Sequence, residues 1–166
     1  MSEQVLTGSV SDCSQVFLGS LLVFNDFSSP RCISKQELKD LADRSQTKYW
    51  NKWNVSVRLP DSRSCMQAAQ EMRGAGNNRC VSPWRYRVEQ EDDRIPRDIA
   101  FAECICKGCI IDGQQNQSYN SKLVFAWMKI LKKTTGKCQD SIKYMVKKEF
   151  IKVPVGCTCV VPNYMK

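Results

Sequence analysis

Closely spaced cysteines are the residues of this sequence that could carry chemistry. Three of them lie within six positions of AECICKGC (102–109), and two more lie in VGCTCV (155–160). Thiols at such spacings can bind zinc, act as a redox pair or form structural disulfides. Each of these chemistries belongs to a different class of protein, so the rest of the sequence has to distinguish them.

A zinc site is disfavoured by the spacing of the second pair. Structural zinc sites commonly use two cysteines separated by two to four residues, because a tight turn must direct both thiolates at one ion. Cys106 and Cys109 have that spacing, but Cys157 and Cys159 are separated by one residue. On a strand, such a pair lies on one face about 6.6–7 Å apart along the chain. We therefore expect no metal and no cofactor.

The absence of histidine limits the chemistry further. With no histidine in the chain, Cys/His zinc fingers and Ser-His or Cys-His nucleophile pairs are excluded. No glycine-rich phosphate loop is present, and Asp92 and Asp93 have the character of turn residues. A redox Cys-x-x-Cys pair would have to begin a helix in a βαβ unit. We therefore predict a protein that is not an enzyme and has no catalytic residue.

Disulfides fit the cysteine spacing. Two same-face cysteines on a strand can each bridge to a neighbouring strand, because facing Cα atoms lie about 4.5–5.5 Å apart. We expect two bridges between the 157–159 pair and the 104–109 cluster, each closing a loop of roughly 50 residues and contributing about 4 kcal/mol in the chain-entropy model. Gly108 and Gly156 precede cysteines directly and permit positive φ or a close approach of strands.

Composition and charge narrow the class of partner. The 166 residues suit one domain with extensions, and ten cysteines exceed ordinary usage. A net charge of +8 predicts attraction to acidic partners, with eight lysines gathered between Lys129 and Lys152. A solvated strand face is the simpler interpretation of this lysine band. Arginines and aromatics are not interleaved as in nucleic-acid modules, and no apolar run reaches the ~20 residues of a membrane span.

The first half of the chain is expected to be an irregular, partly helical extension. The apolar stretch 16–24 has the length of a secretory h-region, so residues 1–29 are a candidate leader whose alternative is a buried segment. Over 30–79, Ser34 and Glu37 form a capping-box pattern that begins a helix at 34–44. Alternating apolar residues predict a strand at 51–60, and helix formers predict a second helix at 65–73.

The second half of the chain is expected to be all-β. Strand-like segments alternate with polar turns rich in Gly, Pro, Asn and Asp. The predicted strands cover 84–90, 99–106, 123–131 and 142–161, and the last of them is one long strand or a bent pair. The predicted turns cover 91–98, 111–121 and 134–141.

Three segments of this half are similar to a known cytokine family. SPWRYRVEQEDDRIPRDIAFAECICKGC (82–109), the Asn120-Ser121 pair and EFIKVPVGCTCVVP (149–162) resemble the interleukin-17 family, and RCISKQEL (31–38) extends the resemblance. The resemblance implies a cystine-knot-type cytokine fold of two β-hairpins over 80–166. It also implies secretion, dimerisation and binding to interleukin-17-family receptor ectodomains, with inflammatory and host-defence signalling.

The resemblance also implies a disulfide pattern. The family lacks the third bridge of a full knot and carries serines instead, which correspond to Ser82 and Ser121. The implied pairs are Cys104–Cys157, Cys109–Cys159, and Cys138 with Cys32 or Cys65, the last commonly across two subunits.

Two cysteines depart from the family pattern. Cys80 stands where a serine is expected, and Cys106 is an extra cysteine, so a Cys80–Cys106 bridge is a hypothesis. Removal of a leader that contains Cys13 would leave nine cysteines. One of them would then bridge two chains or stay free, which agrees with a covalent homodimer.

Further candidate sites lie outside the cysteine cluster. We expect Trp84, Arg85, Tyr86 and Arg87 near a receptor groove, because aromatics and arginine are enriched in interface hot spots. The alternative for Trp84 is core packing. Strand alternation places the two arginines on one exposed face with Val81 or Glu89.

Two sequons and one competing function complete the expectations. Asn54 and Asn116 each begin a sequon, and the second lies in a polar loop that suits a glycan. The competing function is an extracellular, disulfide-rich protein that binds heparin-like glycans through the 129–152 lysine band, without receptor signalling.

Overall fold

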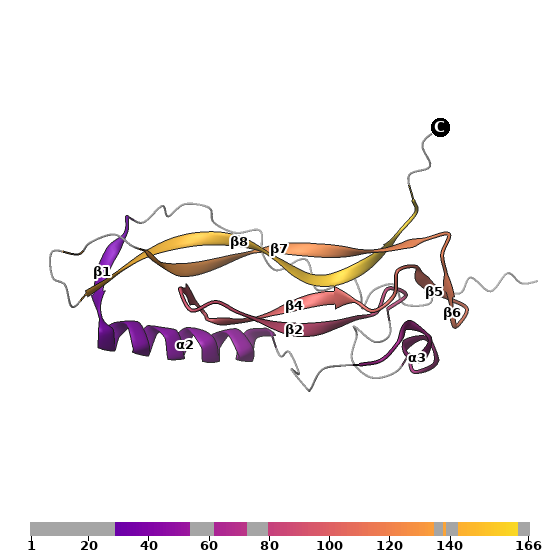
Figure 1. Cartoon of the computed structure of the whole chain (residues 1–166), viewed down its shortest axis with the longest axis horizontal. Helices are drawn as coiled ribbons and strands as arrows, with labels where there is room; N and C mark the ends of the chain where they lie inside the picture. The colour runs from indigo at the N-terminus through magenta and orange to yellow at the C-terminus, as the bar shows by residue number, and fades with distance from the viewer. Residues whose placement is uncertain (1–28, 54–61, 73–79, 135–137, 139–142, 163–166) are drawn as a thin grey trace, which may run out of the picture.

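A computed structural model describes residues 29–53, 62–72, 80–134, 138 and 143–162. Figure 1 shows its dominant feature, a long twisted ribbon of the antiparallel strands β7 (Asn120–Thr134) and β8 (Lys143–Val160). The two strands predicted at 123–131 and 142–161 are thus present, and β8 is continuous, with a register irregularity opposite Val124 and Phe125. The all-β prediction for this half is confirmed.

Two short strands extend the ribbon into a four-stranded sheet. The strand β1 (Arg31–Ser34) pairs with the first residues of β8, and β3 (Arg94–Ile95) pairs with the last part of β7. The order is therefore β1-β8-β7-β3. The sequence analysis predicted a turn at 91–98 and no strand at 31–34, so both short strands are findings of the structure.

The second hairpin lies beneath the ribbon in Figure 1. It consists of β2 (Trp84–Gln90) and β4 (Asp98–Cys104), close to the predicted strands. Its turn contains a cis Ile95–Pro96 peptide bond and the buried side chain of Arg94. The Arg94 guanidinium donates to the carbonyl oxygens of Glu89 (2.9 Å), Arg97 (3.0 Å) and Pro96 (3.3 Å), so one side chain ties the whole turn together.

A third, short hairpin occupies part of the predicted turn at 111–121. It joins β5 (Cys109–Ile111) to β6 (Gln114–Asn116). The two connecting residues, Asp112 and Gly113, have φ values of 50° and 74°. An Asp-Gly pair is favoured in such two-residue turns because both positions require positive φ.

One long helix packs on the inner face of the ribbon. The helix α2 (Lys35–Trp53) begins with the predicted capping box: the Ser34 N–H donates to Glu37 (2.7 Å) and the Glu37 N–H donates to Ser34 Oγ (3.2 Å). The helix continues nine residues beyond the predicted end, so the strand prediction is wrong for 51–53, and 54–60 lie outside the described residues. Trp53, at which the predicted alternation starts, follows Tyr49 by four residues, which is a helical spacing.

A second helix, α3 (Cys65–Gln70), lies where a helix was predicted. Its N-terminus has a capping box between Ser64 and Gln67. The described helices include none that is long and apolar enough to cross a membrane.

Three clusters of buried side chains hold these layers together. The largest joins α2 to both hairpins through Tyr49, Ile99, Ile130, Val153 and Val155. The second joins α3 to the β5 region, and the third lies around Trp84 and Cys157. The inner face of the ribbon is therefore covered by α2 and by the β2–β4 hairpin.

Candidate functional site

Two disulfides join the β2–β4 hairpin region to β8. Cys104 bonds to Cys157, and Cys109 bonds to Cys159, with Cα–Cα distances of 5.8 and 5.9 Å. These are the pairs that the resemblance implies. Together with residues 104–109 and 157–159 they close a covalent ring.

Two serines lie against this ring. Ser121 Oγ lies 3.0 Å from Ser82 Oγ and 2.7 Å from the carbonyl oxygen of Gly108. Ser82 is buried and its Oγ lies 3.7 Å from Cys109 Sγ. The two serines that the resemblance singles out are thus in contact with each other and with the ring.

Both glycines beside the ring allow close approach rather than positive φ. A Cβ added at Gly108 would lie 2.4 Å from the carbonyl oxygen of Asn116, a backbone atom that cannot move aside easily. A Cβ at Gly156 would lie 3.1 Å from the Trp84 ring. The close-approach alternative of the sequence prediction therefore applies to both positions.

The hypothesis of a Cys80–Cys106 bridge is wrong. Cys106 bonds to Cys65, with a Cα–Cα distance of 4.9 Å. The reason is the position of α3, whose residues Ala68 and Ala69 pack with Cys106 in one buried cluster and bring Cys65 beside it. Cys80 is also disulfide-bonded.

Cys138 bonds to Cys32, with a Cα–Cα distance of 5.9 Å. This is one of the two partners left open by the sequence, and the bond lies within one chain. Because Cys32 belongs to β1, the bridge holds β1 beside the start of β8 and so holds the beginning of α2 in place.

The aromatic residues of β2 face inward. Trp84 is only 4% exposed and packs with Cys80, Ala102 and Cys157. Trp84 therefore packs in the core, as the alternative predicted. Tyr86 is partly buried and its hydroxyl donates to the Val155 carbonyl oxygen at 3.1 Å. Burial raises the pKa of Tyr86 above its ordinary value.

The arginines of β2 face outward and share one carboxylate. Arg85 Nε lies 3.3 Å and Arg87 Nε lies 2.8 Å from the carboxylate oxygens of Glu103, which belongs to the paired strand β4. Arg87 also pairs with Glu89, and its guanidinium lies 5.7 Å from the centre of the Phe101 ring. The ion pairs hold the two guanidinium groups side by side on one open face.

Of the two sequons, only the one at Asn116 lies among the described residues. Asn54 lies outside the described residues. Asn116 ends β6, and its side-chain oxygen accepts a hydrogen bond from the Ser118 N–H at 2.8 Å.

The sequence prediction missed Glu103 as the partner of the arginines, although strand pairing opposite Arg85 could have indicated it.

The sequence comparisons agree with this geometry. A family model described as Interleukin-17 matches residues 80–161. Human Interleukin-17C is 40% identical over 94 residues, which are 52% of this chain and 48% of that protein. Mouse Interleukin-17C is 36% identical over 96 residues, covering 52% and 48%. Mouse Interleukin-17F is 31% identical over 113 residues, covering 68% and 65%.

The chain spans about half the length of the Interleukin-17C relatives it matches. The matched segment 80–161 begins at Cys80 and contains both hairpins, the disulfide ring and the two serines. Through this segment the chain belongs to the interleukin-17 family.

Proposed function

We propose that this protein is a secreted cytokine that forms a homodimer and binds interleukin-17-type receptor ectodomains in inflammatory and host-defence signalling. The observation that carries the proposal is the family match over 80–161, together with the disulfide ring inside it. The proposal includes a leader at 1–29, an extension at 30–79 and a receptor-binding domain at 80–166. Relatives in this family are named as interleukins, which supports a signalling role rather than an enzymatic one.

The receptor contact is assigned to the outer face of the β2–β4 hairpin. Arg85 and Arg87 are held there by Glu103, and 53% of the Arg87 side chain is exposed. Arginine is enriched in interface hot spots because its planar head forms several directed hydrogen bonds. Trp84 contributes from beneath: it packs against Gly156 and the Cys157 bridge and fixes the backbone that presents both arginines.

The homodimer contact is assigned to the outer face of the β7–β8 ribbon, opposite α2. Three large apolar side chains are exposed there by 43–58%. They are Phe125, Trp127 and Phe150. A soluble protein rarely leaves such a group uncovered, and a second copy is the occupant that the family membership favours. Lys152 Nζ lies 4.8 Å from the centre of the Phe125 ring, so this lysine is accommodated among the aromatics.

The dimer is tested by sedimentation of the secreted, oxidised protein. We expect Trp127→Glu to shift it from dimer to monomer, because a buried carboxylate at a dimer contact would lack a partner. Met66→Glu is the matched control, since Met66 is also exposed (72%) but lies on α3. A wild-type protein that sediments as a monomer at micromolar concentration contradicts this part of the proposal.

The receptor contact is tested by the double variant Arg85→Ala/Arg87→Ala. We expect at least a tenfold loss of affinity for the receptor ectodomain that the wild type binds, with unchanged thermal stability. Arg97→Ala is the control, because Arg97 is equally exposed (57%) and also ion-paired, but lies in the turn of the same hairpin. Equal losses in both variants would show that general charge, not this face, governs binding.

The glycan-binding alternative without receptor signalling is not favoured by the relatives. The structure also shows that several lysines of the 129–152 band, on which this alternative was based, have partners within the domain. Lys132 lies 3.4 Å from Asp93, Lys147 pairs with Glu149, and Lys152 lies over Phe125. These three side chains already have partners within the domain, so the band is a weaker anion site than its sequence suggested.

A further inference from the structure

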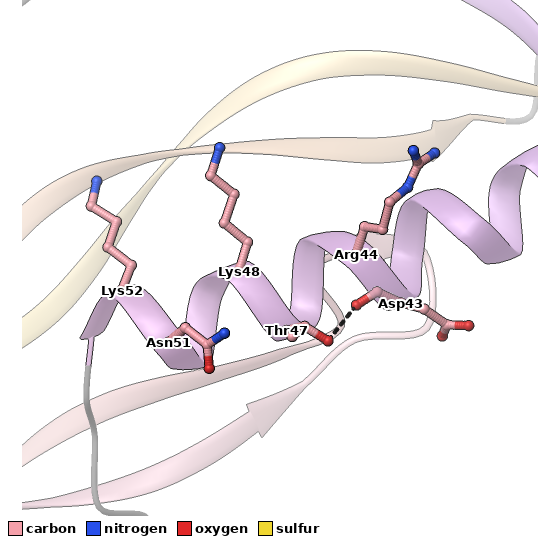
Figure 2. Close-up of a pocket in the computed structure, with 6 residues that line it drawn as sticks. All are labelled: Asp43, Arg44, Thr47, Lys48, Asn51 and Lys52. Carbon is pink, nitrogen blue, oxygen red and sulfur yellow. Dashed lines mark hydrogen bonds between the residues drawn. The ribbon is translucent and has the colours of Figure 1, made fainter.

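A row of cations on α2 remains outside the function proposed above. Arg44, Lys48 and Lys52 follow one another at intervals of four residues, which places them on one side of the helix. Figure 2 shows their side chains extending the same way, with the Asp43 carboxylate pointing away from them. With a rise of 1.5 Å per residue, neighbouring members are separated by about 6 Å along the axis.

The cations of this row have no acidic partner in the part of the chain that the structure describes. All three are exposed, and none of the ion pairs of the described residues includes them. Arg44 Nε donates only to the backbone carbonyl of Asp40, at 3.1 Å. Like charges four residues apart on a helix repel each other. The row is therefore a local concentration of positive charge, with one carboxylate, that of Asp40, a single turn before it.

A shallow hollow accompanies the row. It is lined by Asp43, Arg44, Thr47, Lys48, Asn51 and Lys52. The Thr47 hydroxyl donates to the Asp43 carbonyl oxygen at 2.9 Å, which leaves the hydroxyl oxygen as an acceptor, and Asn51 offers an exposed amide. The hollow thus combines three cations with neutral hydrogen-bonding groups. The Asp43 carboxylate at its far side opposes an anion and limits how far one can extend across it.

We propose that the Arg44–Lys48–Lys52 row binds an extracellular sulfated polysaccharide. A linear polyanion can place successive negative groups along a straight row of cations, while Thr47 and Asn51 can contact its hydroxyl groups. The choice of an extracellular polyanion over a nucleic acid rests on the secretion included in the proposed function. The site is independent of the dimer face, because α2 packs through Tyr49 on the inner face of the ribbon and Trp127 lies on the outer face.

Two double variants of the same helix test the site. Lys48→Gln/Lys52→Gln removes two charges from the row, and Lys35→Gln/Lys39→Gln removes two exposed charges from a side about 140° around the helix. The probe is a size-defined heparin octasaccharide, titrated by calorimetry at several salt concentrations. We expect the first variant to lose about tenfold in affinity and the second less than twofold. The salt dependence of binding should fall by about one unit per lysine removed from the row.

Three results would overturn the proposal. The first is equal weakening by both variants, which would indicate general charge attraction. The second is failure of the wild type to bind the octasaccharide at physiological salt. The third is tighter binding to single-stranded RNA of equal charge or to phosphatidylserine vesicles. Receptor binding is measured on the same variants. If a variant loses heparin affinity but keeps its receptor affinity, the result supports the heparin site independently of the receptor contact. If the protein binds heparin but no receptor, the result contradicts only the proposed function.

Discussion

The hydroxyl oxygens of Ser82 and Ser121 lie 3.0 Å apart beside the disulfide ring. Ser82 lies two residues before the start of β2 at Trp84, and Ser121 belongs to β7, so the contact joins the segment that leads into β2 to the β7–β8 ribbon. Ser121 also lies 2.7 Å from the Gly108 carbonyl oxygen. A hydrogen-bonded serine pair thus links the same elements that a third disulfide would link.

Replacing both serines with cysteine should therefore complete the knot. In Ser82→Cys/Ser121→Cys the longer C–S bonds bring the two side-chain atoms closer, and we expect the two new thiols to form a disulfide without rearrangement. The residues are 39 apart in sequence, but the existing bridges already restrict the unfolded chain. We expect a gain of about 1–2 kcal/mol, which corresponds to several degrees in melting temperature. Peptide mapping under non-reducing conditions identifies the bond. Alkylation of both new thiols in the folded, oxidised protein would contradict the geometry.

The Cys65–Cys106 bridge should stabilise α3 without being required for the central ring. In Cys65→Ser/Cys106→Ser we expect a loss of about 2–4 kcal/mol and fast hydrogen exchange over Cys65–Gln70, because Cys106 is buried with Ala68 and Ala69. Exchange in β8 should stay slow. Cys32→Ser/Cys138→Ser is the comparison, with fast exchange expected at β1 instead. Uniform loss of protection in both variants would show that the bridges are not local.

The stability of the fold should fall at alkaline pH through Tyr49. Its buried hydroxyl oxygen accepts a hydrogen bond from the Ala100 N–H at 2.8 Å, and burial raises the pKa of Tyr49 above the ordinary value of 10.0. Because the folded-state pKa is the higher one, this contribution is complete below pH 10 and is lost as pH rises through the folded-state pKa. Urea unfolding between pH 8 and 11 measures the slope.

Tyr49→Phe separates the two roles of that hydroxyl. The variant leaves the Ala100 N–H without its acceptor, so we expect a loss of about 1–3 kcal/mol at pH 7. It should also reduce the alkaline slope, leaving the part due to Tyr86, whose pKa burial raises as well. Identical alkaline slopes in the variant and the wild type would contradict the assignment to Tyr49.

Arg94 should be indispensable to the β2–β4 turn. It is 2% exposed, donates to three backbone carbonyls and lies 3.3 Å from a Glu91 carboxylate oxygen. Lysine cannot reproduce this planar fork, so we expect Arg94→Lys to cost about 2–3 kcal/mol in chemical denaturation. Arg97→Lys, at an exposed ion pair in the same turn, should change stability by less than about 0.5 kcal/mol. A small loss of stability in Arg94→Lys would contradict this role, because it would mean that water can replace the hydrogen bonds of the guanidinium.

Local patterns in the sequence were sufficient for the four long strands and for the capping box at Ser34, but not for the short strands β1, β3, β5 and β6. The alternation in 84–90 and the long apolar run at 123–131 reflect faces that the fold buries, and Ser34 with Glu37 marks a helix start that local hydrogen bonds determine. The length of α2 could not be predicted in this way. Its last two turns are stabilised by Tyr49 packing on Ile99, Ile130 and Val153, which are distant in sequence.

The residues of the site also divide into those that sequence motifs indicate and those that depend on tertiary packing. The ring pairs and the serine positions followed from motifs of the family, whereas the partner of Cys106 depends on where α3 packs, which no local spacing encodes. Tryptophan is a residue type that is enriched at interfaces, but Trp84 is buried against Gly156. Only the three-dimensional contacts distinguish an interface role from core packing. The cation row on α2 depends on the extension of the helix to Trp53, because its last two members lie beyond the predicted end.

The central claim is that this domain is a receptor ligand of the interleukin-17 type, and direct binding tests it. The measurement is surface plasmon resonance of the secreted, fully oxidised protein against a panel of interleukin-17 receptor ectodomains. We predict saturable binding to at least one ectodomain, abolished when the disulfides of the ring are reduced. Absence of binding to every ectodomain of the panel, by protein whose mapped disulfides match the structure, would contradict it.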